Sequence, residues 1–268
     1  MNLLHKVIVV TGGGNGIGRQ LVLGLVRRGS FVAAVDINTQ ALQETVKLAG
    51  ELGTRISTHV VNITDRQSVE ALPAAVISAH GSVDGLINNA GIIQPFVRVN
   101  DLTYEQIEKV MQVNFYGLLY MTKSFLPFLL NRPEAHLVNI SSMGGFLPVP
   151  GQSIYGASKA AVNLLTEGLY SELLDTNVHV TVVYPGAIGT DISINSGVMT
   201  REQSEKIDRG KMRMTPPEDA ARMILDGVEK NKFRVLAGSD AKFMDFLFRF
   251  NPKYATTFIF NQMKSLLK

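Results

Sequence analysis

Short apolar runs alternate along this chain with longer segments in which apolar and polar residues follow a helical period. The apolar runs are rich in Val and Ile and are mostly apolar on both faces, as strands are when they lie inside a parallel sheet. They occupy residues 6–11, 31–36, 56–61, 83–88, 136–141, 178–184 and 233–237. The helical segments between them cover about residues 16–29, 39–53, 66–80, 103–131, 153–175 and 217–230.

This alternation of strand and helix predicts an α/β fold. A parallel sheet of about seven strands should carry helices on both faces, with right-handed crossovers between the strands. The sequence has no linker, low-complexity tract or internal repeat beyond the alternation, so we expect one domain over residues 1–238. Two segments fall outside the pattern: a polar stretch at 187–215, expected to be a long loop, and a terminal extension at 239–268.

The composition excludes several classes of protein. Hydrophobic residues make up 46% of the 268 residues and charged residues 18%, which is enough for a core and argues against disorder. The chain has no Cys, which excludes disulfide scaffolds, Cys-ligated zinc, iron–sulfur clusters and thiol nucleophiles. Its five His show no metal-ligand spacing, so we expect no metal. This composition is compatible with the reducing cytoplasm, where we expect the protein to reside.

The net charge of +3 is too small and too diffuse to indicate a nucleic-acid partner. The excess is local, because residues 242–268 hold five basic residues and a single acid. No apolar stretch approaches the roughly 20 residues that a membrane span needs. The apolar start of the chain leads straight into a glycine motif, so we expect no signal peptide.

A glycine-rich stretch lies between the first predicted strand and the first predicted helix. It reads T-G-G-G-N-G-I-G over residues 11–18. Glycines here let the backbone turn tightly and approach a pyrophosphate, while the following helix points its free N–H groups at the anion. A plain strand–helix turn is the alternative. The residues predicted to hold a dinucleotide are Gly12, Asn15, Gly16, Ile17 and Gly18.

Asp36 ends the second predicted strand, about 20 residues past the glycine stretch. A carboxylate at this position can accept hydrogen bonds from the adenosine ribose hydroxyls and would repel a 2′-phosphate. Positions 37 and 38 and the glycine stretch contain no Lys or Arg that could offset the repulsion. We therefore expect NAD to be preferred over NADP, although a solvated Asp at a strand end would look the same.

Tyr155 and Lys159 are four residues apart in a predicted helix, so their side chains share one face. A free Tyr titrates near pH 10, and lowering its pKa by about 3 units takes roughly 4 kcal/mol. A Lys ammonium at contact distance supplies on the order of 4 kcal/mol at an effective dielectric constant near 20, whereas dry burial acts in the opposite direction. The pair could form a general acid/base, or it could be an ordinary exposed helical pair.

These residues, taken together with other motifs, resemble the short-chain dehydrogenases/reductases in their compact single-domain form. The resemblance runs from about residue 6 to residue 235. Besides the glycine stretch, the matching segments are N-I-T-D at 62–65, N-N-A-G at 88–91, V-N-F-Y-G at 113–117, N-I-S-S at 139–142, Y-G-A-S-K at 155–159 and P-G-A-I-G-T at 185–190. Each motif is modest alone, but their joint occurrence in this order is specific.

The resemblance implies a catalytic tetrad. Ser142 would bind the substrate oxygen and Tyr155 would exchange its proton. Lys159 would lower the pKa of the tyrosine and hold the nicotinamide ribose, and Asn114 would interrupt its helix and seat a water for proton relay. The family's serine usually lies thirteen residues before the tyrosine, which selects Ser142 over Ser141.

The resemblance also implies a fold and further cofactor contacts. The fold would be a Rossmann-type doubly wound sheet with strand order 3-2-1-4-5-6-7, and the protein would form a homodimer or homotetramer. Asn62 departs from the Asp that many relatives carry there. In addition to the glycine stretch, Asp36, Tyr155 and Lys159, the implied cofactor-binding residues are Asn62, Ile63, Asn89, Pro185, Gly186, Ile188 and Thr190.

Residues 187–215 follow the nicotinamide motif and could close over a substrate or form a solvated loop. Other residues expected near the substrate are Gln94, Met143, Phe146 and Gln152. In the extension, Phe243, Phe246, Leu247 and Phe250 share one helical face, and Pro252 should break the segment. The extension could pack on its own domain or a sister subunit, wall a lipophilic substrate, or lie on a membrane surface.

We therefore expect an oxidoreductase that prefers NAD and interconverts a small secondary alcohol and its ketone. A 3-oxoacyl-thioester reductase is an alternative, although such enzymes usually use NADP, which Asp36 disfavours. A non-catalytic dinucleotide-binding scaffold is the other alternative. The sequence motifs do not distinguish steroid, sugar, polyol, hydroxy-acid and fatty-alcohol substrates.

Overall fold

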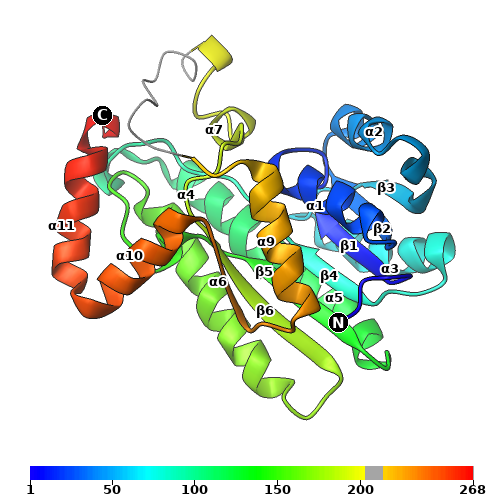
Figure 1. Ribbon diagram of the computed structural model, residues 1–268. Coiled ribbons are helices and arrows are strands. Elements are labelled where there is room, and N and C mark those ends of the chain that lie inside the picture. Colours follow the sequence, from blue (N-terminus) through cyan, green and yellow to red (C-terminus); the bar gives the residue numbers. More distant parts are fainter. Residues whose placement is uncertain (203–213, 268) are drawn as a thin grey trace.

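Seven parallel strands form one sheet in the described part of the chain, in the order β3-β2-β1-β4-β5-β6-β7, in the computed structural model (Figure 1). The structure describes residues 1–202 and 214–267. The strand order confirms the predicted Rossmann-type sheet. The strands are β1 Val7–Thr11, β2 Phe31–Asp36, β3 Ile56–Val60, β4 Gly85–Asn88, β5 Ala135–Ile140, β6 Val178–Pro185 and β7 Arg234–Ala237.

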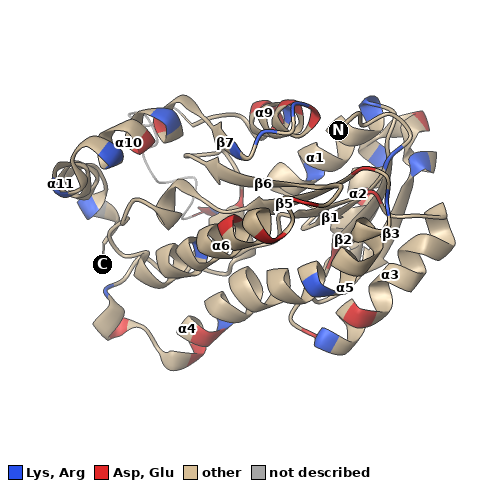
Figure 2. Ribbon diagram, turned by 90° about the horizontal axis from the view of Figure 1, so that it is seen from below, with Lys and Arg blue, Asp and Glu red and all other residues tan. Residues whose placement is uncertain are grey.

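Helices cover both faces of the sheet, and Figure 2 shows the sheet between the two helical layers. One layer contains α1 (Gly16–Arg27) and α9 (Pro217–Glu229), and it shares a core cluster with the sheet. The opposite layer contains α3 (Arg66–His80), α5 (Leu118–Leu130) and α6 (Ser153–Glu172), with a second core cluster. The remaining helices in the first 200 residues are α2 (Thr39–Leu48), α4 (Tyr104–Met111) and α7 (Ile192–Asn195).

The apolar pattern of β1 explains how these layers form. All five residues of β1 are buried. Ile8 and Val10 belong to the core cluster on the α1–α9 side, and Val7 and Val9 belong to the cluster on the α3–α5–α6 side. Successive side chains of a strand point to opposite faces, so a strand that is apolar at every position has to be covered on both sides.

The structure corrects two of the predicted helices. The segment expected to be one helix over 39–53 ends at Leu48, and a 3₁₀ helix follows over Gly50–Arg55. Gly50 has a φ of +58°, a left-handed conformation that an α-helix cannot continue through. The segment 103–131 contains α4 and α5, joined by a π-helical segment over Gln112–Gly117. Asn114 lies inside this π segment, which often marks a functional site.

The terminal extension forms two helices, α10 (Ser239–Phe250) and α11 (Pro252–Met263). Pro252 is the first residue of α11, where a helix tolerates proline. Met244, Ala255 and Ile259 of this hairpin pack around Leu147 in a third apolar cluster. None of the helices in the described residues is long and apolar enough to cross a membrane.

The first turn of α10 is attached to the segment that follows β6. The carboxylate of Asp240 accepts a hydrogen bond from the backbone N–H of Ala187 at 2.6 Å. The two ends of the predicted substrate loop also meet, because Gly189 N–H donates to the carbonyl of Thr215 and Thr215 N–H donates to the carbonyl of Ala187. Residues 203–213 of this loop lie outside the described residues.

Candidate active site

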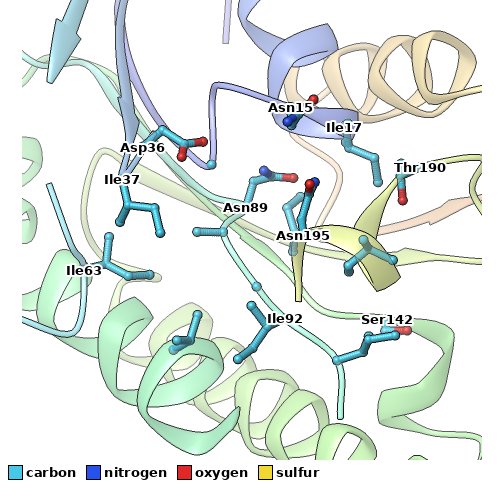
Figure 3. Close-up of a pocket in the computed structure, with 18 of the residues that line it drawn as sticks. Asn15, Ile17, Asp36, Ile37, Ile63, Asn89, Ile92, Ser142, Thr190 and Asn195 are labelled. Atoms are coloured by element: carbon cyan, nitrogen blue, oxygen red, sulfur yellow. The ribbon is translucent and has the colours of Figure 1, made fainter. Parts of the chain in front are cut away.

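A cavity of about 770 Å³ lies at the carboxyl ends of the strands. It extends from the tips of β1 and β2, where Gly12 and Asp36 lie, to the end of β5 and the first turns of α6. Figure 3 shows Asp36 and Ser142 on opposite sides of this cavity, with Asn89 and Ile92 between them. Open α/β sheets bind their ligands at this edge, where the strand order reverses.

The glycine stretch forms a close-fitting cradle at the start of α1. Gly12 and Gly16 have φ values of +67° and +52°, which strain any residue with a side chain. A Cβ atom on Gly18 would lie 2.0 Å from the carbonyl oxygen of Gly12, so only glycine fits there. The N-cap residue Asn15 makes no side-chain cap hydrogen bond, which leaves the first N–H groups of α1 open to an anion.

The neighbouring β4 holds this cradle in place. Asn89 donates from its side chain to the carbonyl of Thr11 at 2.9 Å, and the hydroxyl of Thr11 accepts from the backbone N–H of Asn89 at 2.9 Å. A Cβ atom on Gly12 would lie 2.9 Å from the Asn89 amide nitrogen. Asn89 therefore supports the backbone of the glycine stretch, and it also lines the cavity.

Asp36 lies at the cavity end of β2. Its carboxylate accepts from the backbone N–H groups of Gly14 and Asn38, each at 3.0 Å. Ile37 and Asn38 follow it in the cavity wall. The exposed Lys109 of α4 also lines the cavity.

Ser142, Tyr155 and Lys159 meet at the other end of the cavity. The Ser142 hydroxyl hydrogen-bonds the phenol of Tyr155 and accepts from the backbone N–H of Gly144 at 3.0 Å. The buried Ser141 instead donates to the carbonyl of Lys159 at 2.9 Å. Of the two neighbouring serines, Ser142 is therefore the one whose hydroxyl meets the phenol.

The Lys159 ammonium does not touch the phenol. Its Nζ atom donates to the carbonyl of Ile140 at 2.9 Å and lies 6.0 Å from the centre of the Tyr155 ring. Burial raises the pKa of Tyr155, and the hydrogen bond from Ser142 lowers it only in part. Burial lowers the pKa of Lys159 to about 8. Tyr155 and Lys159 therefore do not form the contact ion pair expected from the sequence. Without a ligand, the pKa of Tyr155 lies above its ordinary value.

Asn114 is fully buried behind the cavity. Its side-chain amide donates to the carbonyl of Ile92 at 2.9 Å and to the hydroxyl of Ser158 at 3.0 Å, and its amide oxygen accepts from the N–H of Ile92 at 2.8 Å. Both amide hydrogens are used within the protein. The side chain thus ties the segment after β4 to α6, instead of presenting an amide to a water in the cavity.

The four residues expected near the substrate lie outside the lining of the described cavity. Gln94 is buried, and its amide oxygen accepts from the N–H groups of Ile154 and Tyr155 at 2.7 and 3.0 Å. It therefore caps the start of α6. The amide of Gln152 donates to the carbonyl of Gln94 at 2.8 Å. The partly buried Met143 and Phe146 pack against the cluster formed by the α10–α11 hairpin.

Replacing Gln94 by Leu should destabilise the protein and disturb catalysis at a distance. The change leaves two N–H groups at the start of α6 without their acceptor, which costs about 2–3 kcal/mol in free energy of unfolding. Because one of these groups belongs to Tyr155, turnover should fall while dinucleotide affinity is kept. Urea unfolding and nucleotide titration measure the two effects. At about pH 5, where burial keeps a carboxyl protonated and able to donate to the carbonyl of Gly151, Gln94→Glu keeps the acceptor and should lose less stability than Gln94→Leu. Equal losses would contradict the capping role.

Most of the cofactor contacts implied by the sequence line this cavity. They are Gly12, Asn15, Gly16, Ile17, Asp36, Asn62, Ile63, Asn89, Pro185, Gly186, Ile188 and Thr190, with Tyr155 and Lys159. Gly18 instead packs beneath the loop. Sequence reasoning missed several apolar and polar wall residues, among them Val61, Ala90, Ile92, Ile93, Gln112 and Val113, whereas Ile192 and Asn195 lie in the predicted substrate loop. Several of these positions adjoin a recognised motif, which is the one signal that could have found them.

Comparisons with known proteins agree with this arrangement. A family model described as short chain dehydrogenase matches residues 6–200. The chain is 39% identical over 250 residues to a putative oxidoreductase, SadH, of Mycobacterium tuberculosis, covering 91% of this chain and 90% of that protein. It is 34% identical over 226 residues to the 3-oxoacyl-acyl-carrier-protein reductase FabG of Thermotoga maritima, covering 84% of this chain and 91% of that protein.

Solved structures of short chain dehydrogenases resemble this fold. A short chain dehydrogenase/reductase from Burkholderia phymatum in complex with NAD superposes with a TM-score of 0.81 at 27% identity, covering 88% of this chain and 90% of that chain. A short chain dehydrogenase from Burkholderia cenocepacia in complex with NADP superposes with a TM-score of 0.80 at 25% identity, covering 97% and 99%.

Proposed function

Because the chain belongs to the short-chain dehydrogenase family, we propose that it is an NAD-preferring oxidoreductase that transfers a hydride between a nicotinamide ring and a secondary alcohol or its ketone. One observation carries the proposal. Ser142, Tyr155 and Lys159 line one end of a cavity, and Asp36 and the glycine cradle form its other end. The cavity thus joins an acid/base group to a site that fits a dinucleotide.

The residues present fit a nicotinamide dinucleotide. The cradle of Gly12 and Gly16, where a side chain would strain or fill the turn, suits a diphosphate. Asp36 would accept from the adenosine ribose hydroxyls, and Lys159 would donate to the nicotinamide ribose. Ile188 and Thr190 would contact the carboxamide. When bound, the nicotinamide supplies the hydride acceptor or donor, and its oxidised form adds positive charge near the phenol.

In this mechanism the protein holds the substrate oxygen and moves one proton. The Ser142 hydroxyl would donate to the substrate oxygen, and the Oη atom of Tyr155 would take the alcohol proton or return it to the carbonyl. The Lys159 ammonium, mostly protonated at neutral pH with its pKa of about 8, would stabilise the phenolate. Residues 187–215 would close over the substrate, and the protein would act as a homodimer or homotetramer.

Turnover tests the proposal directly. The purified protein, mixed with NAD⁺ and a panel of secondary alcohols, should produce NADH, which its absorbance and fluorescence report. Binding of NADH without turnover of any alcohol or ketone would instead indicate a scaffold. A 3-oxoacyl-thioester reductase is the second candidate, favoured by the similarity to FabG of Thermotoga maritima. Faster turnover of a 3-oxoacyl thioester with NADPH than of any alcohol with NAD⁺ would support that candidate.

Asp36 should decide the choice between the two coenzymes. Asp36→Asn removes the charge that would face a 2′-phosphate and keeps an acceptor oxygen for only one of the two N–H groups, those of Gly14 and Asn38, that the carboxylate binds. The ratio of kcat/KM with NADP⁺ to kcat/KM with NAD⁺ should rise about tenfold or more. Asp175→Asn, on the exposed surface after α6, is the matched control and should leave the ratio unchanged. A wild-type enzyme that already favours NADP⁺ would contradict the assignment.

A further inference from the structure

The outer face of the α10–α11 hairpin is aromatic and exposed. Phe243, Phe246 and Phe250 of α10 are 54%, 69% and 80% exposed, and Tyr254 of α11 is 57% exposed. The opposite side of α10 buries Ala241 and Met244 against the domain. The apolar face noted in the sequence therefore points mostly away from the protein's own core, and Leu247 is its member that packs inward.

The exposed rings adjoin one another or the partly buried ring of Phe258, which lies on α11. Phe246 and Phe250 are stacked with centroids 6.4 Å apart. Phe243 meets the ring of Phe258 edge-on at 6.2 Å, and Tyr254 meets the same ring at 6.5 Å. We call these five residues the aromatic patch. Large contiguous apolar surfaces of this kind mark a binding site for a macromolecule or a membrane.

Basic residues adjoin the aromatic patch, and the acids nearby are already engaged. Figure 2 shows basic residues along α10 and α11 and beside β7. Asp245 pairs with Arg234 and Arg249, and Asp240 accepts from the backbone of Ala187. Lys242 and Lys253 form no salt bridge within residues 1–202 and 214–267. The patch therefore has an uncompensated positive charge on its border.

A second cavity, of about 420 Å³, is lined by residues of α9, of β7 at the edge of the sheet and of the first turn of α10. It is lined by the basic residues Lys230, Lys232, Arg234 and Lys242, and Lys242 belongs to α10. Its carboxylate, Asp226, pairs with Arg28. This basic cavity matches the charge of a phosphate headgroup, and it directly adjoins the helix that carries the exposed phenylalanines.

We propose that the α10–α11 hairpin and the basic cavity together bind the surface of a bilayer that carries anionic headgroups. The phenylalanines enter the boundary between headgroups and acyl chains, while the lysines of the cavity hold lipid phosphates. A bilayer fits better than a second copy of the chain, because Lys230, Lys232 and Lys242 form no salt bridge within residues 1–202 and 214–267, and anionic headgroups would neutralise them. The charge complementarity thus selects an anionic lipid surface.

Sedimentation of the full-length protein with vesicles tests this proposal. The protein should bind vesicles of equimolar phosphatidylcholine and phosphatidylglycerol, should bind phosphatidylcholine vesicles at least about tenfold more weakly, and should be released by salt. Phe246→Ser combined with Phe250→Ser should abolish binding. Lys230→Gln combined with Lys232→Gln should weaken binding about 30-fold, since each lysine near an anionic surface contributes about a fivefold factor.

Matched controls separate this outcome from misfolding and from self-association. Tyr104→Ser removes an aromatic side chain that is 81% exposed on α4 and should leave vesicle binding intact. Circular dichroism and thermal unfolding show that each variant is folded. The proposal would be overturned if the wild-type protein did not bind vesicles that contain phosphatidylglycerol. A second result would also overturn it. If the wild type bound no vesicles, and light scattering showed that the Phe246/Phe250 variant changed from an oligomer to a monomer, the patch would be a contact between two copies of the chain.

Discussion

Replacing Tyr155 by Phe is expected to reduce kcat by about 10³-fold, with dinucleotide affinity nearly unchanged. In the proposed mechanism the phenol is the acid/base group at the end of the cavity, and its hydroxyl is the group that Ser142 contacts. Removal of this one oxygen leaves the ring, the start of α6 and the glycine cradle in place. Steady-state kinetics in both directions and titration of NADH fluorescence measure the two quantities.

Tyr170→Phe is the matched control for this variant. Tyr170 belongs to the same helix, but its ring packs on Phe233, with ring centroids 4.2 Å apart, away from the cavity. It should retain full activity. A Tyr155→Phe enzyme that turned over at a rate close to that of the wild type would show that the proton is exchanged elsewhere.

Lys159→Met should reduce turnover and at the same time stabilise the protein without ligand. The Lys159 ammonium lies 6.0 Å from the centre of the Tyr155 ring. A positive charge about that far from a phenolate stabilises it by about 3 kcal/mol at an effective dielectric constant near 20, so kcat should fall about 100-fold. In wild type, kcat for alcohol oxidation should rise with pH, because burial raises the pKa of Tyr155 and base is needed to ionise it. In the variant, this rise should move to higher pH.

The effect on stability has the opposite sign. Burial lowers the pKa of Lys159 from 10.5 to about 8, so below pH 8 the fold carries the full cost of a buried ammonium, about 3 kcal/mol. Between pH 8 and 10.5 the unfolded chain binds more protons, and wild-type stability rises with pH; above 10.5 the cost is gone. After subtraction of about 1 kcal/mol for the lost hydrogen bond to Ile140, the variant should gain about 2 kcal/mol at neutral pH.

Urea unfolding at pH 7 and at pH 10.5 tests the sign, with the protein free of nucleotide. The advantage of Lys159→Met should disappear at the higher pH. A variant that is less stable than wild type at pH 7 would mean that the buried ammonium is well solvated by the protein, and that its pKa is not lowered.

Strand positions and the end of the cavity formed by the glycine stretch and Asp36 could be predicted from the sequence, because each depends on local signals. The first four residues of β1 are apolar and all five are buried. Gly12 and Gly16 are required by the backbone geometry of one strand–helix turn, and Asp36 ends the neighbouring strand β2. The resemblance to the family added the strand order and the pairing of Ser142 with Tyr155.

The remaining features depend on contacts between distant segments. Gln94 has the residue type of a substrate contact, yet it caps α6 some 60 positions later. The Asn114 amide is held by Ile92 and Ser158, which no local pattern indicates. Spacing placed Tyr155 and Lys159 on one helical face, but it could not indicate that the ammonium would bind the carbonyl of Ile140.

The hydrogen bond between Asp240 and Ala187 has a consequence for any exchange of parts between relatives. It fastens the C-terminal hairpin to the segment that carries Pro185 and Gly186, so the hairpin is not a removable module. A chimera that received the hairpin of another protein would also inherit a different anchor for the substrate-side segment. The membrane binding that we propose for the hairpin and the substrate preference are therefore expected to change together when this region is exchanged.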